Sequence, residues 1–78
     1  MHSRITMLRA ERGWTRQQLA DAIGIHYQTV GYIEREEYAP SLAVALRLAR
    51  VFGVPVEALF SLEPFPPLTG DQLTRRTS

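Results

Sequence analysis

One short segment carries side chains that could bind a partner through directional hydrogen bonds, HYQTVGYIEREE at residues 26–37. At about 100° per residue, a helix formed by this segment points Val30 and Ile33 to one side. The opposite side gathers aromatic, amide and guanidinium groups around a glycine: Tyr27, Gln28, Gly31, Tyr32 and Arg35. A glutamine can bond the edge of adenine with two hydrogen bonds, and tyrosines can contact phosphates or thymine methyl groups. This face is a candidate for binding nucleic acid; the plainer alternative is a solvated helix face that happens to hold a glycine.

Three glutamates in the same segment argue in the other direction: Glu34, Glu36 and Glu37. An anionic duplex repels carboxylates that have no partner of their own. Glutamates beside tyrosines also suit a protein-binding surface, because tyrosine is a frequent anchor of protein interfaces. A second interpretation is therefore open, in which the domain acts mainly as a protein–protein interaction module, such as an antitoxin-like or accessory component.

The composition gives no support to catalysis or to a bound cofactor. The 78 residues include no cysteine, and the two histidines, His2 and His26, are far apart in sequence. Disulfides and thiolate metal sites are excluded, and no cluster of metal ligands is apparent. No nucleophile is paired with a base, and there is no glycine-rich phosphate loop. We expect no enzyme activity, no metal and no cofactor. No apolar run approaches the roughly 20 residues of a membrane span, so the expected location is the cytoplasm.

Capping residues and glycines divide residues 1–62 into five short helices. The expected helices begin near these residues: Ser3, Thr15, His26, Ser41 and Pro55. Glycines after the first, second and fourth helices suit left-handed helix ends, and TRQQ at residues 15–18 is a capping-box pattern. Two short helices joined by a glycine turn have the sequence form of a helix-turn-helix. We expect one compact all-α domain in which the third helix covers residues 26–36, and no segment favours a sheet.

The composition changes after Leu62, to EPFPPLTGDQLTRRTS at residues 63–78. Three prolines and a glycine predict an irregular tail. A chain of this size buries only about 60% of its unfolded surface, so dimerisation is a plausible supplement to its core. The expected dimer surface lies at the end of the fifth helix and the start of the tail: Leu59, Phe60, Leu62 and Phe65. In the alternative, Leu59 and Phe60 help to close the core of their own domain, and the others pack back onto it.

The stretch LRAERGWTRQQLADAIGIHYQTVGYIEREEYAPSLAVALRLARVFGVPVEALF resembles the phage-repressor-like Xre/Cro helix-turn-helix family. Members of that family have five-helix, lambda-repressor-like domains that typically read LRxxRGxTQxxLA…GVSRQTISxIENGKYxPSLxxALKIAxxFGVSxxxLF. The resemblance extends from about Ile5 to Phe60 with every break in register. It implies a sequence-specific regulator of transcription, with a repressor as the expected type. Such a protein would bind a palindromic operator in double-stranded DNA as a homodimer, without a small-molecule ligand.

Matched position by position, the resemblance also implies roles for single residues. Three residues fall where family members place base-reading side chains: Tyr27, Gln28 and Tyr32. Four fall at or near contacts with the DNA backbone: Arg16, Thr29, Arg35 and Ser41. Arg9 matches an arginine that pairs with the glutamate at the position of Glu34, which would turn that carboxylate away from DNA.

The chain departs from the family pattern at both ends of the third helix. Arg35-Glu36-Glu37 stands where the family commonly has Asn-Gly-Lys. In family members that glycine caps the helix. Glu36 in its place therefore predicts a different helix end, one form of which is a longer helix. Glu37 replaces attraction to the DNA backbone by repulsion, which predicts lower non-specific affinity, offset in part by the arginines. At the other end His26 replaces the usual serine or threonine cap, and we expect a structural role for it.

Overall fold

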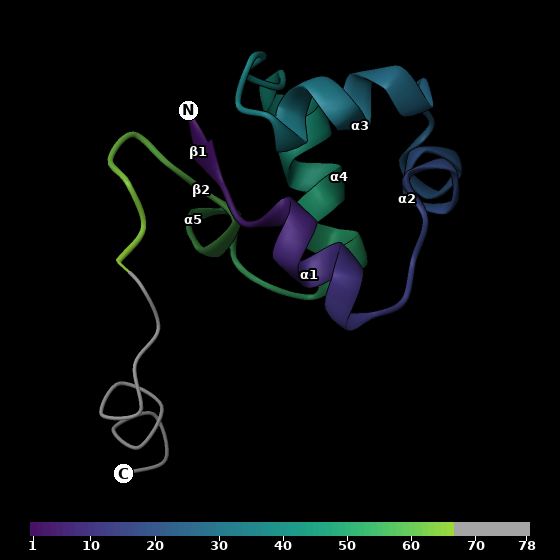
Figure 1. Ribbon diagram of the computed structural model, residues 1–78, viewed down its shortest axis with the longest axis horizontal. Coiled ribbons are helices and arrows are strands. Elements are labelled where there is room, and N and C mark those ends of the chain that lie inside the picture. Colours follow the sequence, from purple (N-terminus) through teal and green to yellow (C-terminus); the bar gives the residue numbers. More distant parts are fainter. Residues whose placement is uncertain (67–78) are drawn as a thin grey trace, which may run out of the picture.

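The structure, a computed structural model, describes residues 1–66, in which five helices surround one apolar core (Figure 1). The helices are α1 (Ile5–Glu11), α2 (Arg16–Ile23), α3 (Tyr27–Glu34), α4 (Leu42–Phe52) and α5 (Val56–Leu59). The predicted five-helix architecture with a helix-turn-helix is confirmed. No helix within the described residues is long and apolar enough to cross a bilayer. The predicted tail lies largely outside the description, since only its first four residues are included.

The starts of α2 and α3 are set by side chains that bond the first free backbone N–H groups. Thr15 Oγ1 accepts from the N–H of Gln18 at 3.0 Å, and Gln18 Oε1 accepts from the N–H of Thr15 at 2.8 Å, which completes the predicted capping box. His26 Nδ1 accepts from the N–H of Gln28 at 3.2 Å. His26 therefore has the structural role that was expected, as the N-cap of α3. These caps fix which residues of α3 face outward.

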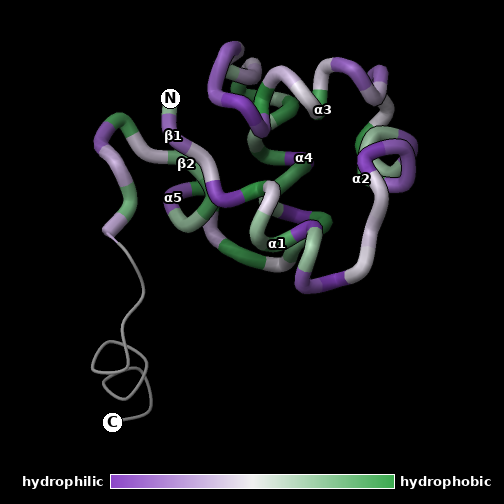
Figure 2. The backbone as a smooth tube through the Cα atoms, viewed as in Figure 1, coloured by the Kyte–Doolittle hydropathy of each residue, from purple (hydrophilic) through white to green (hydrophobic). Residues whose placement is uncertain are grey.

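The core is formed by apolar residues from all five helices, with Phe52 as the largest fully buried side chain. Its other fully buried members are Ile5, Leu19, Val30, Ile33, Leu48 and Leu59. Figure 2 shows apolar residues recurring along α4 and between α4 and α5, whereas the loop after α3 is hydrophilic. Val30 and Ile33 anchor α3 to this core. The side chains of Tyr27, Gln28 and Tyr32 therefore face solvent.

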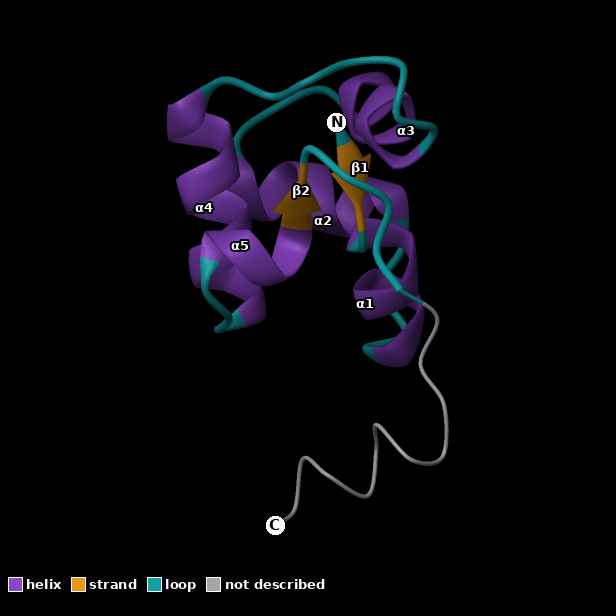
Figure 3. Cartoon of the chain, turned by 90° about the vertical axis from the view of Figure 1, so that its left-hand side faces the viewer, coloured by secondary structure: helices purple, strands orange, loops and turns teal. Residues whose placement is uncertain are grey.

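A short antiparallel pair of strands contradicts the expectation that no sheet forms. β1 (His2–Ser3) pairs with β2 (Phe60–Ser61), with His2 opposite Ser61 and Ser3 opposite Phe60 (Figure 3). α1 consequently begins after Arg4, whose N–H donates to the carbonyl of Leu59 at 2.9 Å. Two-residue strands have no alternating apolar pattern for a sequence to reveal. They form because α5 brings the end of the domain beside its beginning.

The expected dimer surface is only partly accessible. Leu59 is 0% exposed and belongs to the apolar core, which is the alternative expected for it, so it is not accessible to a second chain. Phe60 is half-buried, as is Phe65, whose ring centroid lies 4.1 Å from the guanidinium carbon of Arg4. Leu62 is 85% exposed. The accessible apolar surface of this region therefore centres on Leu62.

The end of α3 is not extended, although Glu36 stands where the family commonly has glycine. Glu36 takes the left-handed conformation itself, with φ 62°. Its N–H donates to the carbonyl of Ile33, and that of Glu37 donates to Tyr32, both at 3.0 Å, which is a Schellman end. The prediction of a longer helix was wrong. Left-handed backbone costs a non-glycine residue about 1–2 kcal/mol. That cost is offset by the Glu36 carboxylate, which accepts the N–H of Ser3 at 2.8 Å.

Candidate nucleic-acid interface

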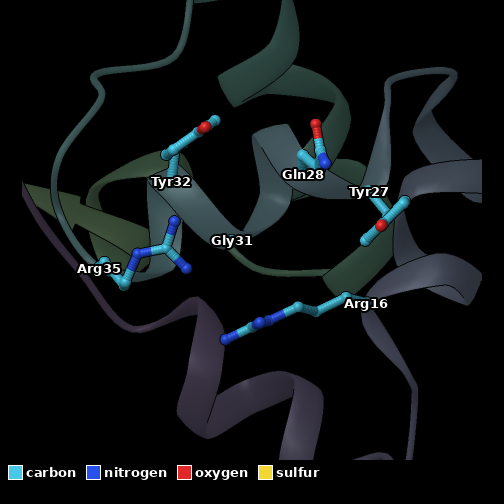
Figure 4. A pocket seen from close by; sticks show the side chains of 6 residues that line it. All are labelled: Arg16, Tyr27, Gln28, Gly31, Tyr32 and Arg35. Carbon is cyan, nitrogen blue, oxygen red and sulfur yellow. The ribbon is translucent and has the colours of Figure 1, made fainter.

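The outward side of α3 and the start of α2 enclose a shallow hollow of about 260 Å³. We call this the α3 surface, and it is lined by Arg16, Tyr27, Gln28, Gly31, Tyr32 and Arg35 (Figure 4). It brings together all three residues predicted to read bases and two of the four predicted to contact the backbone. Both tyrosines are nearly half exposed, at 45% and 48%. The surface can therefore meet a partner without rearrangement of the core.

The base-reading candidates form one row along α3. Figure 4 shows Gln28 between Tyr32 on one side and Tyr27 on the other. The Tyr27 ring stacks on the capping imidazole of His26, with centroids 4.9 Å apart. The Tyr32 ring lies beneath the Arg35 guanidinium, 5.1 Å from centroid to carbon. Each tyrosine is thus held by a neighbour, while the Gln28 amide projects between them.

Glu34 is the centre of the contact between α3 and the two preceding helices. Its side chain is only 2% exposed. Oε2 accepts from Arg9 Nε at 2.6 Å, and Oε1 accepts from Arg16 Nε at 2.7 Å. Arg9 also donates from Nη1 to the carbonyl of Trp14 at 2.8 Å. The expected Arg9–Glu34 pair is present, whereas the bond to Arg16 was not foreseen. It follows from an arginine at the first position of α2, where the family usually has a shorter glutamine.

The remaining two glutamates also have partners in the chain. Glu37 Oε1 accepts from Arg35 Nε at 3.1 Å. Glu36 accepts from the Ser3 N–H, and its other oxygen lies 3.4 Å from His2 Nδ1. All three carboxylates that argued against an anionic partner are thus hydrogen-bonded within the domain. The repulsion expected from Glu37 is reduced by its arginine.

Gly31 allows two guanidinium groups to lie over α3. A Cβ built on Gly31 would be 3.1 Å from Arg35 Nη1 and 3.7 Å from Arg16 Nη1. A glycine inside a helix costs about 1 kcal/mol relative to alanine. A Cβ here would crowd Arg35 Nη1, whereas Arg16 Nη1 lies at an ordinary van der Waals distance, so the glycine leaves room for the Arg35 guanidinium.

Two residues predicted to contact the DNA backbone lie outside the hollow. Thr29 is half-buried in the first turn of α3. Ser41 is the N-cap of α4, where its Oγ accepts from the N–H of Val44 at 3.2 Å. A capping hydroxyl still has its own hydrogen to donate. The capping role of Ser41 is therefore compatible with a bond to a phosphate.

The α3 surface offers amide, phenol and guanidinium groups, which are suited to binding base edges and phosphates. Within residues 1–66 no three histidine, aspartate or glutamate side chains converge on a point that could hold a metal ion. The chemistry that this surface supports is recognition of an anionic partner rich in hydrogen-bond acceptors.

Comparison with known proteins agrees with this geometry. The family described as Helix-turn-helix matches residues 5–59. An uncharacterized HTH-type transcriptional regulator from Archaeoglobus fulgidus is 40% identical over 60 residues, which cover 77% of this chain and 86% of that protein. The uncharacterized HTH-type transcriptional regulator YgzD from Bacillus subtilis is 36% identical over 63 residues, or 81% of this chain and 96% of YgzD.

A solved structure shares the fold. The crystal structure of a transcriptional regulator from Listeria innocua superposes with a TM-score of 0.67 at 23% sequence identity. The match covers 94% of this chain and 70% of the Listeria chain. At this identity the likeness concerns the arrangement of helices alone.

Proposed function

The chain belongs to the helix-turn-helix family, and from that premise we propose that it is a sequence-specific regulator of transcription that binds double-stranded DNA with its α3 surface. Relatives named as transcriptional regulators support DNA-binding regulation as the function. The observation that carries the proposal is the division of charge at α3. Arg16, Arg35 and Gln28 line the hollow, while the glutamates at the end of α3 and just after it are hydrogen-bonded within the domain.

In the proposed complex α3 lies in the major groove, as recognition helices of helix-turn-helix proteins do. The base-reading side chains are Gln28, Tyr27 and Tyr32. The Gln28 amide suits adenine, whose N6 and N7 present a donor and an acceptor side by side. The backbone contacts come from Arg16, Thr29, Arg35 and Ser41. Arg16 stands at the first position of α2, where a helix N-terminus already favours anions.

We further propose a homodimer that acts in the cytoplasm as a repressor, by occupying an operator and blocking transcription from it. Symmetric helix-turn-helix dimers bind half-sites about 34–36 Å apart, so the operator would be palindromic. The proposed dimer contact is the exposed Leu62 with the accessible parts of Phe60 and Phe65.

The function is tested by selecting binding sites from a randomised duplex pool at 50 and 200 mM salt. We expect a palindromic motif to be enriched. Arg16 and Arg35 neutralise one phosphate per protomer if they share it and two if they do not, which gives two to four per dimer and a slope of log affinity against log salt between about −1.8 and −3.6. Affinity should then fall roughly 10- to 100-fold between the two salt concentrations. An absence of enrichment at both would refute the proposal and favour a protein partner, since a contact centred on tyrosines depends little on salt.

The dimer contact is tested by Leu62→Ser, with Leu46→Ser as the matched control on α4. Both leucines are exposed, at 85% and 51%, so neither change disturbs the core. Burying one leucine contributes about 1.5–3 kcal/mol, and symmetry applies it twice. Leu62→Ser should therefore raise the dimer dissociation constant at least tenfold, while Leu46→Ser leaves it unchanged. Sedimentation equilibrium without DNA measures both; a parent protein that is monomeric at micromolar concentration would contradict the dimer, and dissociation by Leu46→Ser alone would move the interface to α4.

A further inference from the structure

We propose that Arg16 and Arg35 act together as a fork that binds one phosphate group above Gly31. The inference rests on the proposed function in one respect, since the phosphate is taken to be a single phosphate of the DNA backbone. It goes beyond two independent backbone contacts, because both arginines are assigned to the same anion.

The two arginines converge from different helices. Arg16 is the first residue of α2, and Arg35 is the C-cap of α3. Their Nη1 atoms lie 3.7 and 3.1 Å from the single point where a Cβ of Gly31 would be. Both guanidinium groups therefore lie beside Gly31, where their like charges repel each other. An anion bound between them converts that repulsion into two attractions.

The carboxylates that accompany each arginine leave the converging ends available. Arg16 donates its Nε to Glu34 at 2.7 Å, and Arg35 donates its Nε to Glu37 at 3.1 Å. In both bonds the donor is Nε, so the Nη groups of each guanidinium are left to point toward the hollow. Arginine binds phosphate best through such a pre-oriented, bidentate arrangement. The Tyr32 ring supports the Arg35 head from the other side.

The position of the fork favours a backbone phosphate over a base edge. Figure 4 shows Tyr32, Gln28 and Tyr27 along one side of the α3 surface and the two arginine heads along the other. A helix lying in the major groove with the first row toward the bases turns the second row toward a flanking strand. A base edge also carries no formal charge, whereas two cations at one point match an anion.

The decisive experiment replaces operator phosphates one at a time by neutral methylphosphonates. For the parent protein we expect one phosphate per half-site whose replacement weakens binding about tenfold. In Arg16→Gln and in Arg35→Gln, replacing that same phosphate should weaken binding by less than about twofold. Arg47→Gln is the control, because Arg47 lies outside the α3 surface and donates to the Ile23 carbonyl. If the two variants become insensitive to replacement of two different phosphates, or of no phosphate, the fork is overturned while the proposed function stays intact.

Gly31→Ala tests the same fork without removing either charge. The added Cβ would press on Arg35 Nη1 at 3.1 Å, a contact that only movement of the guanidinium can relieve. Alanine is the better helix former, so the fold should be retained. We expect operator affinity to fall severalfold and the penalty at the shared phosphate to shrink. Unchanged affinity together with an unchanged penalty would contradict the role given to Gly31.

A titration without DNA separates the site from the function. Sodium phosphate is added at constant ionic strength, with chloride as the reference, while NMR follows the Nε–H resonances of Arg16, Arg35 and Arg47. The fork predicts that Arg16 and Arg35 shift with one shared midpoint and that Arg47 does not respond. If the selection enriches no operator but these shifts are seen, the site binds free phosphate and the DNA proposal fails. If neither the titration nor the methylphosphonate scan couples the two arginines, the fork is refuted.

Discussion

Glu34→Gln is expected to lower the free energy of unfolding by about 3 kcal/mol. The Glu34 carboxylate is almost completely buried and accepts from both Arg9 and Arg16. Glutamine keeps the shape but removes the charge that both guanidinium groups require. Removing one partner of a buried ion pair typically costs 3–5 kcal/mol, and the lower end applies here because Arg16 is 45% exposed.

Thermal and urea denaturation followed by circular dichroism measure the effect. For a domain of this length, 3 kcal/mol corresponds to a fall in melting temperature of about 15 °C. The matched control is Glu37→Gln, which removes a carboxylate from the Arg35–Glu37 pair, where both side chains are about half exposed. Exposed pairs contribute about 0–1 kcal/mol, so this variant should melt close to the parent. Equal losses in the two variants would show that burial of Glu34 adds nothing to its pairing.

The starts of α2, α3 and α4 were predictable because a cap is a local pattern. A capping side chain bonds a backbone N–H only two or three residues ahead, so the type and spacing of a few residues suffice. Thr15 with Gln18 and His26 with Gln28 both follow this rule. The outward face of α3 was equally predictable, since it follows from helical periodicity once Val30 is buried.

The contacts that were missed join residues far apart in sequence. Nothing local indicates that Glu36 bonds the N–H of Ser3, and this contact accompanies a left-handed helix end without glycine. The second arginine on Glu34 has the same origin. Each contact depends on how the end of α3 meets β1 or α2 in space, which no helical or strand period records. Arg16 and Glu36, two of the chain's departures from the family pattern, are therefore positions where the sequence alone was uninformative.

Gln28→Ala is expected to weaken binding to the selected operator about 30-fold per half-site, without changing the dependence on salt. A bidentate bond between an amide side chain and adenine contributes about 1–3 kcal/mol of discrimination, and 1.4 kcal/mol is a factor of ten. Glutamine carries no charge and releases no counterions, so the salt slope stays the same. The matched control is Gln17→Ala, because Gln17 bonds Asp21 within α2 and lies outside the α3 surface.

The diagnostic quantity is the interaction between the protein change and the DNA change. Each base pair of the operator is substituted in turn, and fluorescence anisotropy gives the affinity of the parent and of Gln28→Ala for every duplex. If Gln28 reads a base, the parent loses affinity sharply at one position per half-site and the variant becomes indifferent there alone. The two losses then fail to add, which isolates the contact from any general effect on folding. If Gln28→Ala instead weakens every duplex by the same factor, the residue positions the helix without reading sequence, and base recognition passes to Tyr27 and Tyr32.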